Sequence, residues 1–141
     1  GGAAMLGAPL SNDFATISLS TSSRDWDEIE AKIRGATDTG FVLALYNCGR
    51  GLERTVKILR DIRDEDVPVA ILEDIGRRDA GRNPAGESAT ISTLGSVLDD
   101  WEGESTAGTL AIVGTAETRV VRIDGDQFLV TRRGDYDIAE K

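Results

Sequence analysis

The segment FVLALY at residues 41–46 constrains the fold most, because it is an uninterrupted run of six apolar residues. Such a run is too short to cross a membrane and has the length of a strand that is buried on both faces. Asn47 ends the run. Apolar residues then return at helical spacing, as Leu52, Val56, Leu59 and Ile62. This order predicts a buried strand followed by a helix that packs against a sheet.

Other segments repeat this order of strand and helix. We expect further strands at residues 14–20, 67–72, 90–93 and 109–114. We also expect a helix that is capped by Ser23 and closed by Gly35, and a second one over residues 94–101. An Asp124-Gly125-Asp126 turn between two alternating runs predicts a hairpin. The fold class is therefore α/β, a three-layer sandwich whose central sheet is mixed, mainly parallel and flanked by helices, with an antiparallel edge.

Composition excludes several classes of function. The net charge of −9 opposes binding to nucleic acid or to anionic lipid. The chain has no histidine and one cysteine, Cys48, so it can form neither an internal disulfide, nor a zinc site of the usual Cys/His kind, nor a histidine-based catalytic triad. We expect no metal site. The first ten residues lack the basic start of a signal peptide, and no apolar run is long enough to span a bilayer, so we expect a cytoplasmic protein.

Three predicted strands end in residues that could line a ligand crevice. These ends are residues 45–47, 73–76 and 113–116. If the three strands are parallel neighbours, their carboxyl ends lie at the same end of the sheet, which is where open α/β sheets bind ligands. The alternative is that Asn47 and Gly114 are ordinary turn residues.

The other candidate motifs have equally plain alternatives. Glu73 and Asp74 could bind a metal or act as a base, or they could be two solvated acids. Cys48 could be a reactive thiol, but without a histidine to activate it a small loop residue is the simpler interpretation. The glycines at 49 and 51 do not have the spacing of a dinucleotide-binding motif, and the chain contains no P-loop.

Several segments, taken together and in order, resemble one family. They are GAPLSNDFATISLS, WDEIEAKIRGATDTGFVLALYN, VPVAILEDIGR, STLGSVL, LAIVGTAETRV and FLVTRRGDY. In this order they are similar to the second half of the tetrapyrrole methylases of cobalamin biosynthesis, and most of all to the members that methylate carbon 17 of precorrin-3B. The resemblance covers nearly the whole chain from about Gly2, and it depends on the combination of motifs.

The resemblance implies a fold and a reaction. Family members have two α/β domains, bind S-adenosylmethionine in the cleft between them and act as homodimers. Transferred position by position, the resemblance implies cofactor contacts at Asn47, Ile75, Gly76, Gly108 and Thr109.

The same resemblance implies that Arg132 and Arg133 meet a carboxylate-rich precorrin, although an exposed arginine pair can equally be solvated. It indicates no catalytic side chain, because methyl transfer mainly requires that donor, acceptor carbon and leaving group are aligned.

Two departures from the family limit the resemblance. Residues 48–50 (Cys-Gly-Arg) stand where the family has a proline and a serine-containing basic loop, which leaves the identity of the substrate open. The family's N-terminal cofactor-loop domain has no counterpart in the sequence. We therefore expect residues 1–141 to be a single C-terminal domain that does not turn over alone. The alternatives are a stand-alone tetrapyrrole-binding or dimerisation module and a flavodoxin-like or receiver-like domain.

Overall fold

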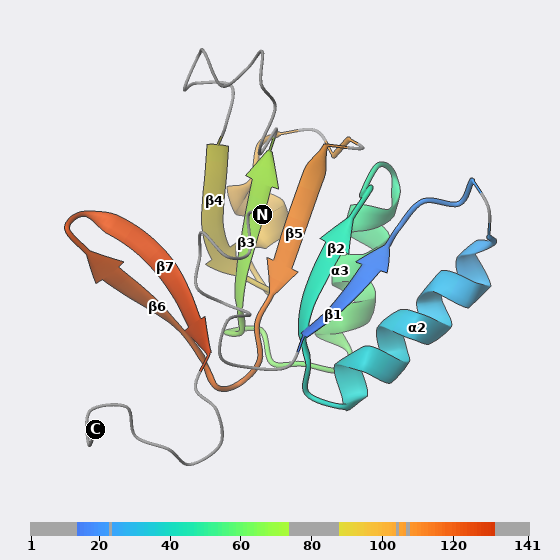
Figure 1. Cartoon of the computed structure of the whole chain (residues 1–141), viewed down its shortest axis with the longest axis horizontal. Coiled ribbons are helices and arrows are strands. Elements are labelled where there is room, and N and C mark those ends of the chain that lie inside the picture. Colours follow the sequence, from blue (N-terminus) through green and yellow to red (C-terminus); the bar gives the residue numbers. More distant parts are fainter. Residues whose placement is uncertain (1–13, 23, 74–87, 104, 107, 132–141) are drawn as a thin grey trace.

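A five-stranded sheet forms the centre of the molecule (Figure 1). The computed structural model describes residues 14–22, 24–73, 88–103, 105–106 and 108–131. The strands of the central sheet are, in spatial order, β1 (Phe14–Ser18), β2 (Val42–Tyr46), β5 (Thr109–Val113), β3 (Pro68–Glu73) and β4 (Ser88–Thr93). The predicted α/β class with a mixed sheet and flanking helices is confirmed.

The direction of β5 is the main difference from the expected topology. β1 and β2 are parallel neighbours, but β5 lies between β2 and β3 and runs antiparallel to both. β4 is antiparallel to β3 and forms the predicted antiparallel edge. Three strands thus share one direction, yet only one hydrogen-bonded pair is parallel. The chain returns along the sheet through the segment between β4 and β5, so that β5 starts at the end where β3 finishes.

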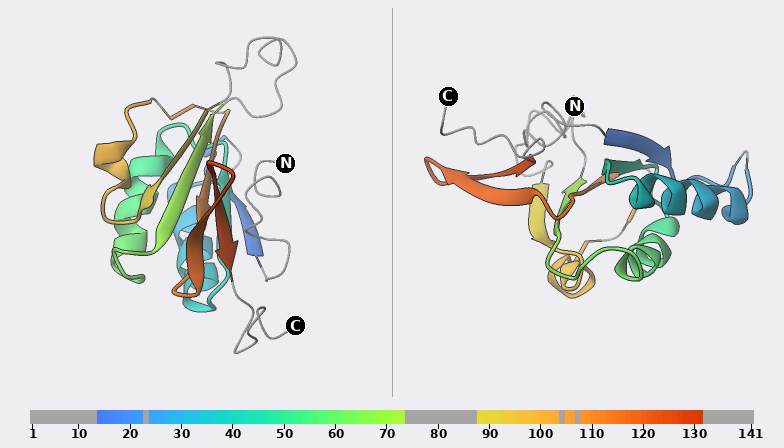
Figure 2. Two further views of the ribbon diagram at one scale, coloured as in Figure 1. Left: turned by 90° about the vertical axis from the view of Figure 1, so that its left-hand side faces the viewer. Right: turned by 90° about the horizontal axis from the view of Figure 1, so that it is seen from below.

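Three helices are described, and they pack on one face of the sheet (Figure 2). They are α2 (Trp26–Asp38), α3 (Gly51–Arg60) and the short α5 (Val97–Asp100). The N-cap of α2 is Asp25, whose carboxylate accepts from the Glu28 N–H at 3.1 Å, and not Ser23 as expected. Gly35 does not end α2, because the helix continues to Asp38. The tertiary contacts of this face outweigh the modest cost of one helical glycine.

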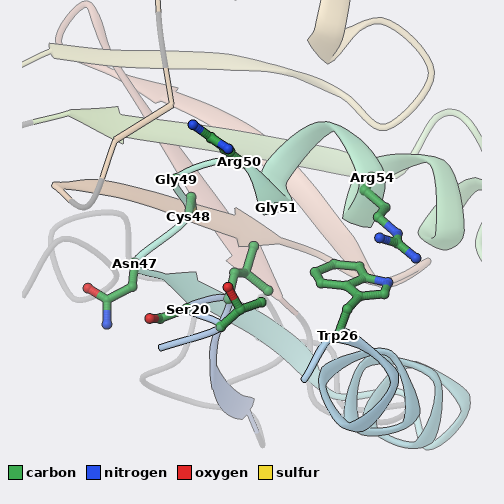
Figure 3. Close-up of a pocket in the computed structure, with 10 residues that line it drawn as sticks. Ser20, Trp26, Asn47, Cys48, Gly49, Arg50, Gly51 and Arg54 are labelled. Carbon is green, nitrogen blue, oxygen red and sulfur yellow. The ribbon is translucent and has the colours of Figure 1, made fainter. Parts of the chain in front are cut away.

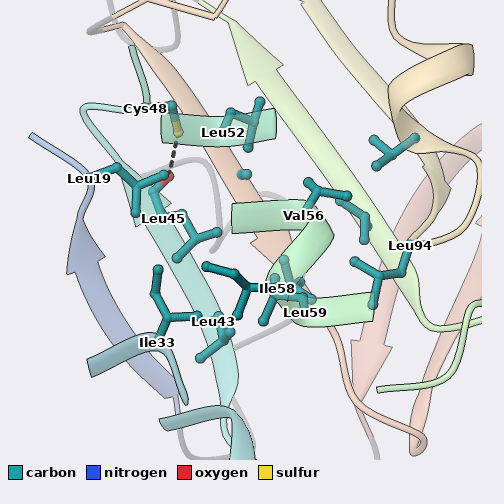
Figure 4. Close-up of a cluster of buried hydrophobic side chains, with 14 of the residues drawn as sticks. Leu19, Ile33, Leu43, Leu45, Cys48, Leu52, Val56, Ile58, Leu59 and Leu94 are labelled. Atoms are coloured by element: carbon teal, nitrogen blue, oxygen red, sulfur yellow. Dashed lines mark hydrogen bonds between the residues drawn. The ribbon is translucent and has the colours of Figure 1, made fainter. Parts of the chain in front are cut away.

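The apolar strands are buried on both faces because alternate side chains enter two separate clusters. Leu43, Leu45 and Ile71 point toward the helices and pack with residues such as Leu52, Val56, Leu59 and Leu94 (Figure 4). Val42, Ala44, Ala70, Leu72 and Ile112 point the other way and pack with Leu129 of β7. The unbroken apolar run at residues 41–46 is explained by this arrangement.

The predicted hairpin consists of β6 (Thr118–Ile123) and β7 (Asp126–Thr131), which form a sheet of their own. Asp124 and Gly125 make the turn with φ of 53° and 87°, as a two-residue hairpin turn of type I′ requires. The hairpin starts beside Gly114, where a Cβ atom would lie only 2.5 Å from the Thr118 Oγ1. A glycine at 114 therefore lets the hairpin pack closely against the end of β5.

Candidate functional site

The candidate site lies at one end of the sheet, where strands β1, β2 and β3 finish and strand β5 begins. Ser18 of β1 is level with Tyr46 of β2, and Glu73 of β3 is level with Thr109 of β5. Two predicted cofactor residues, Gly108 directly before β5 and Thr109 at its start, therefore lie at the same end of the sheet as the end of β2. Parallel strand ends and the start of an antiparallel strand bring backbone groups from four strands together here.

Gly114 does not lie at this end of the sheet, so the expectation that it lines the ligand crevice is wrong. It follows the end of β5, and its N–H donates to the carbonyl of Pro68, the first residue of β3, at 2.9 Å. Because β5 runs antiparallel to β2 and β3, its carboxyl end lies at the end of the sheet that is opposite to the candidate site. Gly114 has the packing role described above.

Asn47 occupies the corner immediately after β2. Its φ of 50° is in the left-handed region, which asparagine tolerates better than most residues. The side-chain amide donates to the Ser18 Oγ at 3.2 Å, so Asn47 also links the ends of β1 and β2. The residue is exposed, and its side chain is accessible to a ligand. Asn47 thus acts as a turn residue and is also available for binding.

Hydrogen bonds join the loop after β2 to the loop before β5. The Gly49 N–H donates to the Thr106 carbonyl at 3.1 Å, and the Thr106 N–H donates to the Thr109 Oγ1 at 2.9 Å. Thr109 is buried and its hydroxyl is occupied by this contact, whereas Gly108 is exposed. The structure therefore places Asn47, Gly108 and Thr109 at the same end of the sheet. Their contacts with a cofactor remain a prediction.

The remaining predicted site residues cannot be placed. Ile75 and Gly76 lie outside the described residues, and so do Arg132 and Arg133. Asp74 lies outside them as well, while Glu73 is half-buried at the end of β3. Glu73 packs near Trp101, because a Cβ at Gly103 would touch both side chains.

A cavity of about 530 Å³ opens beside Asn47 (Figure 3). It lies between the β1–α2 connection and the β2–α3 connection, and its lining includes Ser20, Trp26, Arg50 and Arg54. The sequence motifs did not point to these residues. The one available signal was the Gly49-Arg50-Gly51 segment in front of an amphipathic helix, which places a cation beside a helix N-terminus.

Cys48 is among the residues that line the same cavity, but its side chain belongs to the hydrophobic core. The thiol is fully buried and donates to the Leu45 carbonyl at 3.3 Å. Burial raises the pKa of the Cys48 thiol to about 12. A thiol with this pKa is neutral at physiological pH, so Cys48 is a packed core residue and not a nucleophile.

Curated relatives match almost the whole chain. It is 35% identical over 133 residues to the precorrin-3B C(17)-methyltransferase of a Sinorhizobium species, covering 91% of this chain and 48% of that protein. It is 34% identical over 137 residues to a probable cobalt-factor III C(17)-methyltransferase of Salmonella typhimurium, covering 94% and 51%. The chain thus spans about half the length of these relatives. No protein-family model matches it.

Solved structures show the same fold. The methyltransferase CobJ superposes with a TM-score of 0.71 at 24% identity, over 92% of this chain and 51% of that one. A uroporphyrin-III C-methyl transferase from Thermus thermophilus, complexed with S-adenyl homocysteine, superposes with a TM-score of 0.52 at 18% identity, over 75% and 43%. Within the described ranges no helix is long and apolar enough to cross a membrane. The curated relatives confirm the resemblance predicted from the motifs, and the solved structures confirm the fold.

Proposed function

From its homology to the tetrapyrrole methylases of cobalamin biosynthesis, we propose that this chain is the C-terminal domain of an S-adenosylmethionine-dependent methyltransferase. The substrate is a precorrin or its cobalt complex, and the methyl acceptor is carbon 17 of the macrocycle. The observation that carries the proposal is the 35% identity over 133 residues to a precorrin-3B C(17)-methyltransferase. A second domain completes the site, and the protein is a cytoplasmic homodimer.

The residues at this end of the sheet suit S-adenosylmethionine, the cofactor that the proposed function requires. Asn47 presents an exposed amide beside the cavity, and Gly108 offers an exposed backbone without a Cβ that would keep a ligand away. We assign contacts with S-adenosylmethionine to Asn47, Gly108 and Thr109, and to Ile75 and Gly76 by position in the sequence. When bound, the cofactor supplies an electrophilic methyl group on a sulfonium.

In this reaction the protein mainly has to align the methyl donor with the acceptor carbon and to enclose both. The hydrogen bond from Asn47 to Ser18 and the one from Gly49 to Thr106 fix the two loops that border the cofactor. Fixed loops hold a donor and an acceptor in line, which can contribute several kcal/mol to the rate. Transfer to a carbon nucleophile of the substrate does not need an imidazole base, so a chain without histidine is compatible with it.

Calorimetry with S-adenosylhomocysteine tests the proposal on the protein expressed from its complete reading frame. Wild type is expected to bind, and Asn47→Arg is expected to lose binding because the larger side chain fills the corner beside β5. Asp124→Arg is the matched control, since Asp124 also has a positive φ of 53° but lies in the hairpin turn. Asn47→Gly keeps the backbone conformation and isolates the role of the amide.

The proposal would end if intact wild type bound no S-adenosylhomocysteine. If Asn47→Arg and Asp124→Arg bound it equally well, the assignment of a cofactor contact to Asn47 would be wrong. Retained binding of a corrin without binding of the cofactor would instead favour a non-catalytic tetrapyrrole-binding module.

A further inference from the structure

The cavity beside Asn47 has a local charge that is opposite to that of the chain. Its lining contains two charged side chains, Arg50 and Arg54, although the chain carries a net charge of −9. Among the residues that the structure describes, no carboxylate contributes to the lining. Among the described residues neither guanidinium forms an ion pair or a hydrogen bond. Arg54 also interacts electrostatically with Glu30, and this is a smaller cause of the lowered Glu30 pKa than the hydrogen bond from Arg34. Two arginines that line one hollow in an acidic protein indicate an anionic ligand.

Arg54 is held in position by an aromatic ring. Its guanidinium carbon lies 4.5 Å from the centroid of the Trp26 ring (Figure 3). The Trp26 Nε1–H donates to the Glu30 carboxylate at 3.2 Å, which fixes the ring. The Glu30 charge is itself paired with Arg34 at 2.9 Å, and this hydrogen bond is the main reason why the Glu30 pKa is lowered. Trp26 therefore orients Arg54, and Arg34 forms the ion pair with Glu30, on which Arg54 also acts electrostatically.

Arg50 borders the cavity at the start of α3, across from the Trp26–Arg54 stack (Figure 3). Gly51 follows it, and a Cβ atom there would come within 3.3 Å of both Leu19 and Trp26. A larger residue at 51 would push these groups into the hollow, so the glycine keeps the space open. The N-terminus of the ten-residue helix α3 adds favourable backbone dipoles for an anion.

We propose that this cavity binds side-chain carboxylates of the tetrapyrrole substrate, with Arg50 and Arg54 as the recognising residues. The proposal rests on the proposed function, which makes the ligand a macrocycle with several acetate and propionate groups. Planar guanidinium groups match a carboxylate with two parallel hydrogen bonds. Asn47 lines the same cavity, so a substrate anchored here lies next to the predicted cofactor corner.

Dicyanocobyrinic acid, a stable coloured corrin with free carboxylates, is the test ligand for the protein expressed from its complete reading frame. Dicyanocobinamide is the matched ligand, because its carboxylates are amides. We expect wild type to bind the acid more tightly than the amide. Arg50→Gln and Arg54→Gln should each weaken binding of the acid by about 10-fold or more, since a charge-assisted hydrogen bond contributes roughly 1.5–3 kcal/mol.

Three controls sharpen the result. Arg122→Gln removes the same charge from an exposed position on β6 that does not line the cavity, and it should leave binding unchanged. Arg54→Lys keeps the charge without the fork and should restore only part of the affinity. Circular dichroism melting shows whether Arg54→Gln, which loses its contact with Trp26, remains folded.

S-adenosylhomocysteine, measured on the same variants, separates the two sources of a carboxylate. Unchanged affinity for it, with weakened affinity for the corrin acid, supports the proposal. If the arginine variants weaken S-adenosylhomocysteine alone, the carboxylate belongs to the cofactor and the proposal is overturned. Equal corrin affinity of the arginine variants and Arg122→Gln also overturns it. A wild type that binds the corrin through these arginines but not S-adenosylhomocysteine would refute the methyltransferase proposal and leave this one standing.

Discussion

At the scale of single residues, Cys48 shows how a polar-looking loop position can belong to the core. It follows Asn47 directly, yet its side chain is fully buried between β2 and α3 and its neighbour is exposed. The corner at Asn47, with its positive φ, turns the two side chains in different directions. The role of Asn47 as the end of a buried strand was predictable, because the apolar run stops there. The burial of Cys48 was not, because it depends on the loop conformation.

The Cys48 thiol gives a test that depends on pH. Its pKa is about 12 in the fold against 9.0 for an unperturbed thiol, so the folded state retains the proton longer than the unfolded state. The stabilisation from this group is complete below pH 9.0 and is lost as the pH rises toward 12. Urea unfolding across this range should show a loss of stability that is smaller in Cys48→Ala. Faster reaction of the native thiol than of the unfolded thiol with a disulfide reagent would contradict its burial.

At the scale of elements, Arg63 joins segments that are distant in sequence. It follows α3, and its guanidinium donates to the carbonyls of Thr37, Phe41 and Gly114. Thr37 lies in the last turn of α2, Phe41 directly before β2 and Gly114 directly after β5. Burial lowers the pKa of Arg63, as expected for a cation removed from water. The three carbonyls nevertheless hold the Arg63 guanidinium in place at the end of the sheet that is opposite to the candidate site.

Removing Arg63 should destabilise the fold more than the loss of a surface charge. We expect Arg63→Met to lower the free energy of unfolding by about 2–4 kcal/mol, since three carbonyls lose a charged donor. Arg63→Lys should recover only part, because an ammonium group cannot reach all three. Chemical denaturation against Arg122→Met, which removes an exposed arginine of the hairpin, provides the comparison. A similar small effect of both substitutions would show that the contacts of Arg63 contribute little.

Elements were predictable where a pattern has one structural meaning. The apolar runs of β2 and β3 and the stripe of α3 formed as expected. The direction of β5 was not predictable, because TLAIV reads as a strand buried on both faces whichever way it runs. That ambiguity produced the wrong position of Gly114. Gly35 was also misleading, because a glycine near a helix end resembles a C-cap unless the packing beyond it is known.

At the scale of the whole molecule, the excess of acidic groups should make stability depend on salt. A net charge of −9 produces repulsion that the compact state concentrates. We expect the melting temperature to rise between about 0.1 M and about 1 M NaCl, as the Debye length falls from about 10 Å to about 3 Å.

Asp38→Lys provides a matched variant for the salt effect. Asp38 is an exposed acid in the last turn of α2, where the helix dipole disfavours it and no basic residue is present. The substitution should add about 0.3–1 kcal/mol of stability at low salt and reduce the dependence on salt. A melting temperature that does not change with salt in either protein would show that repulsion is unimportant.

The central place of β5 has a consequence for how the molecule is made. β1 with β2 and β3 with β4 are two separate ladders, and only β5 hydrogen-bonds to both. A ribosome therefore exposes two incomplete halves, each with an unsatisfied strand edge, until the residues of β5 have emerged. Such edges attract other strands. The interval before β5 is inserted is thus when a nascent copy is most exposed to misassembly and most in need of a chaperone.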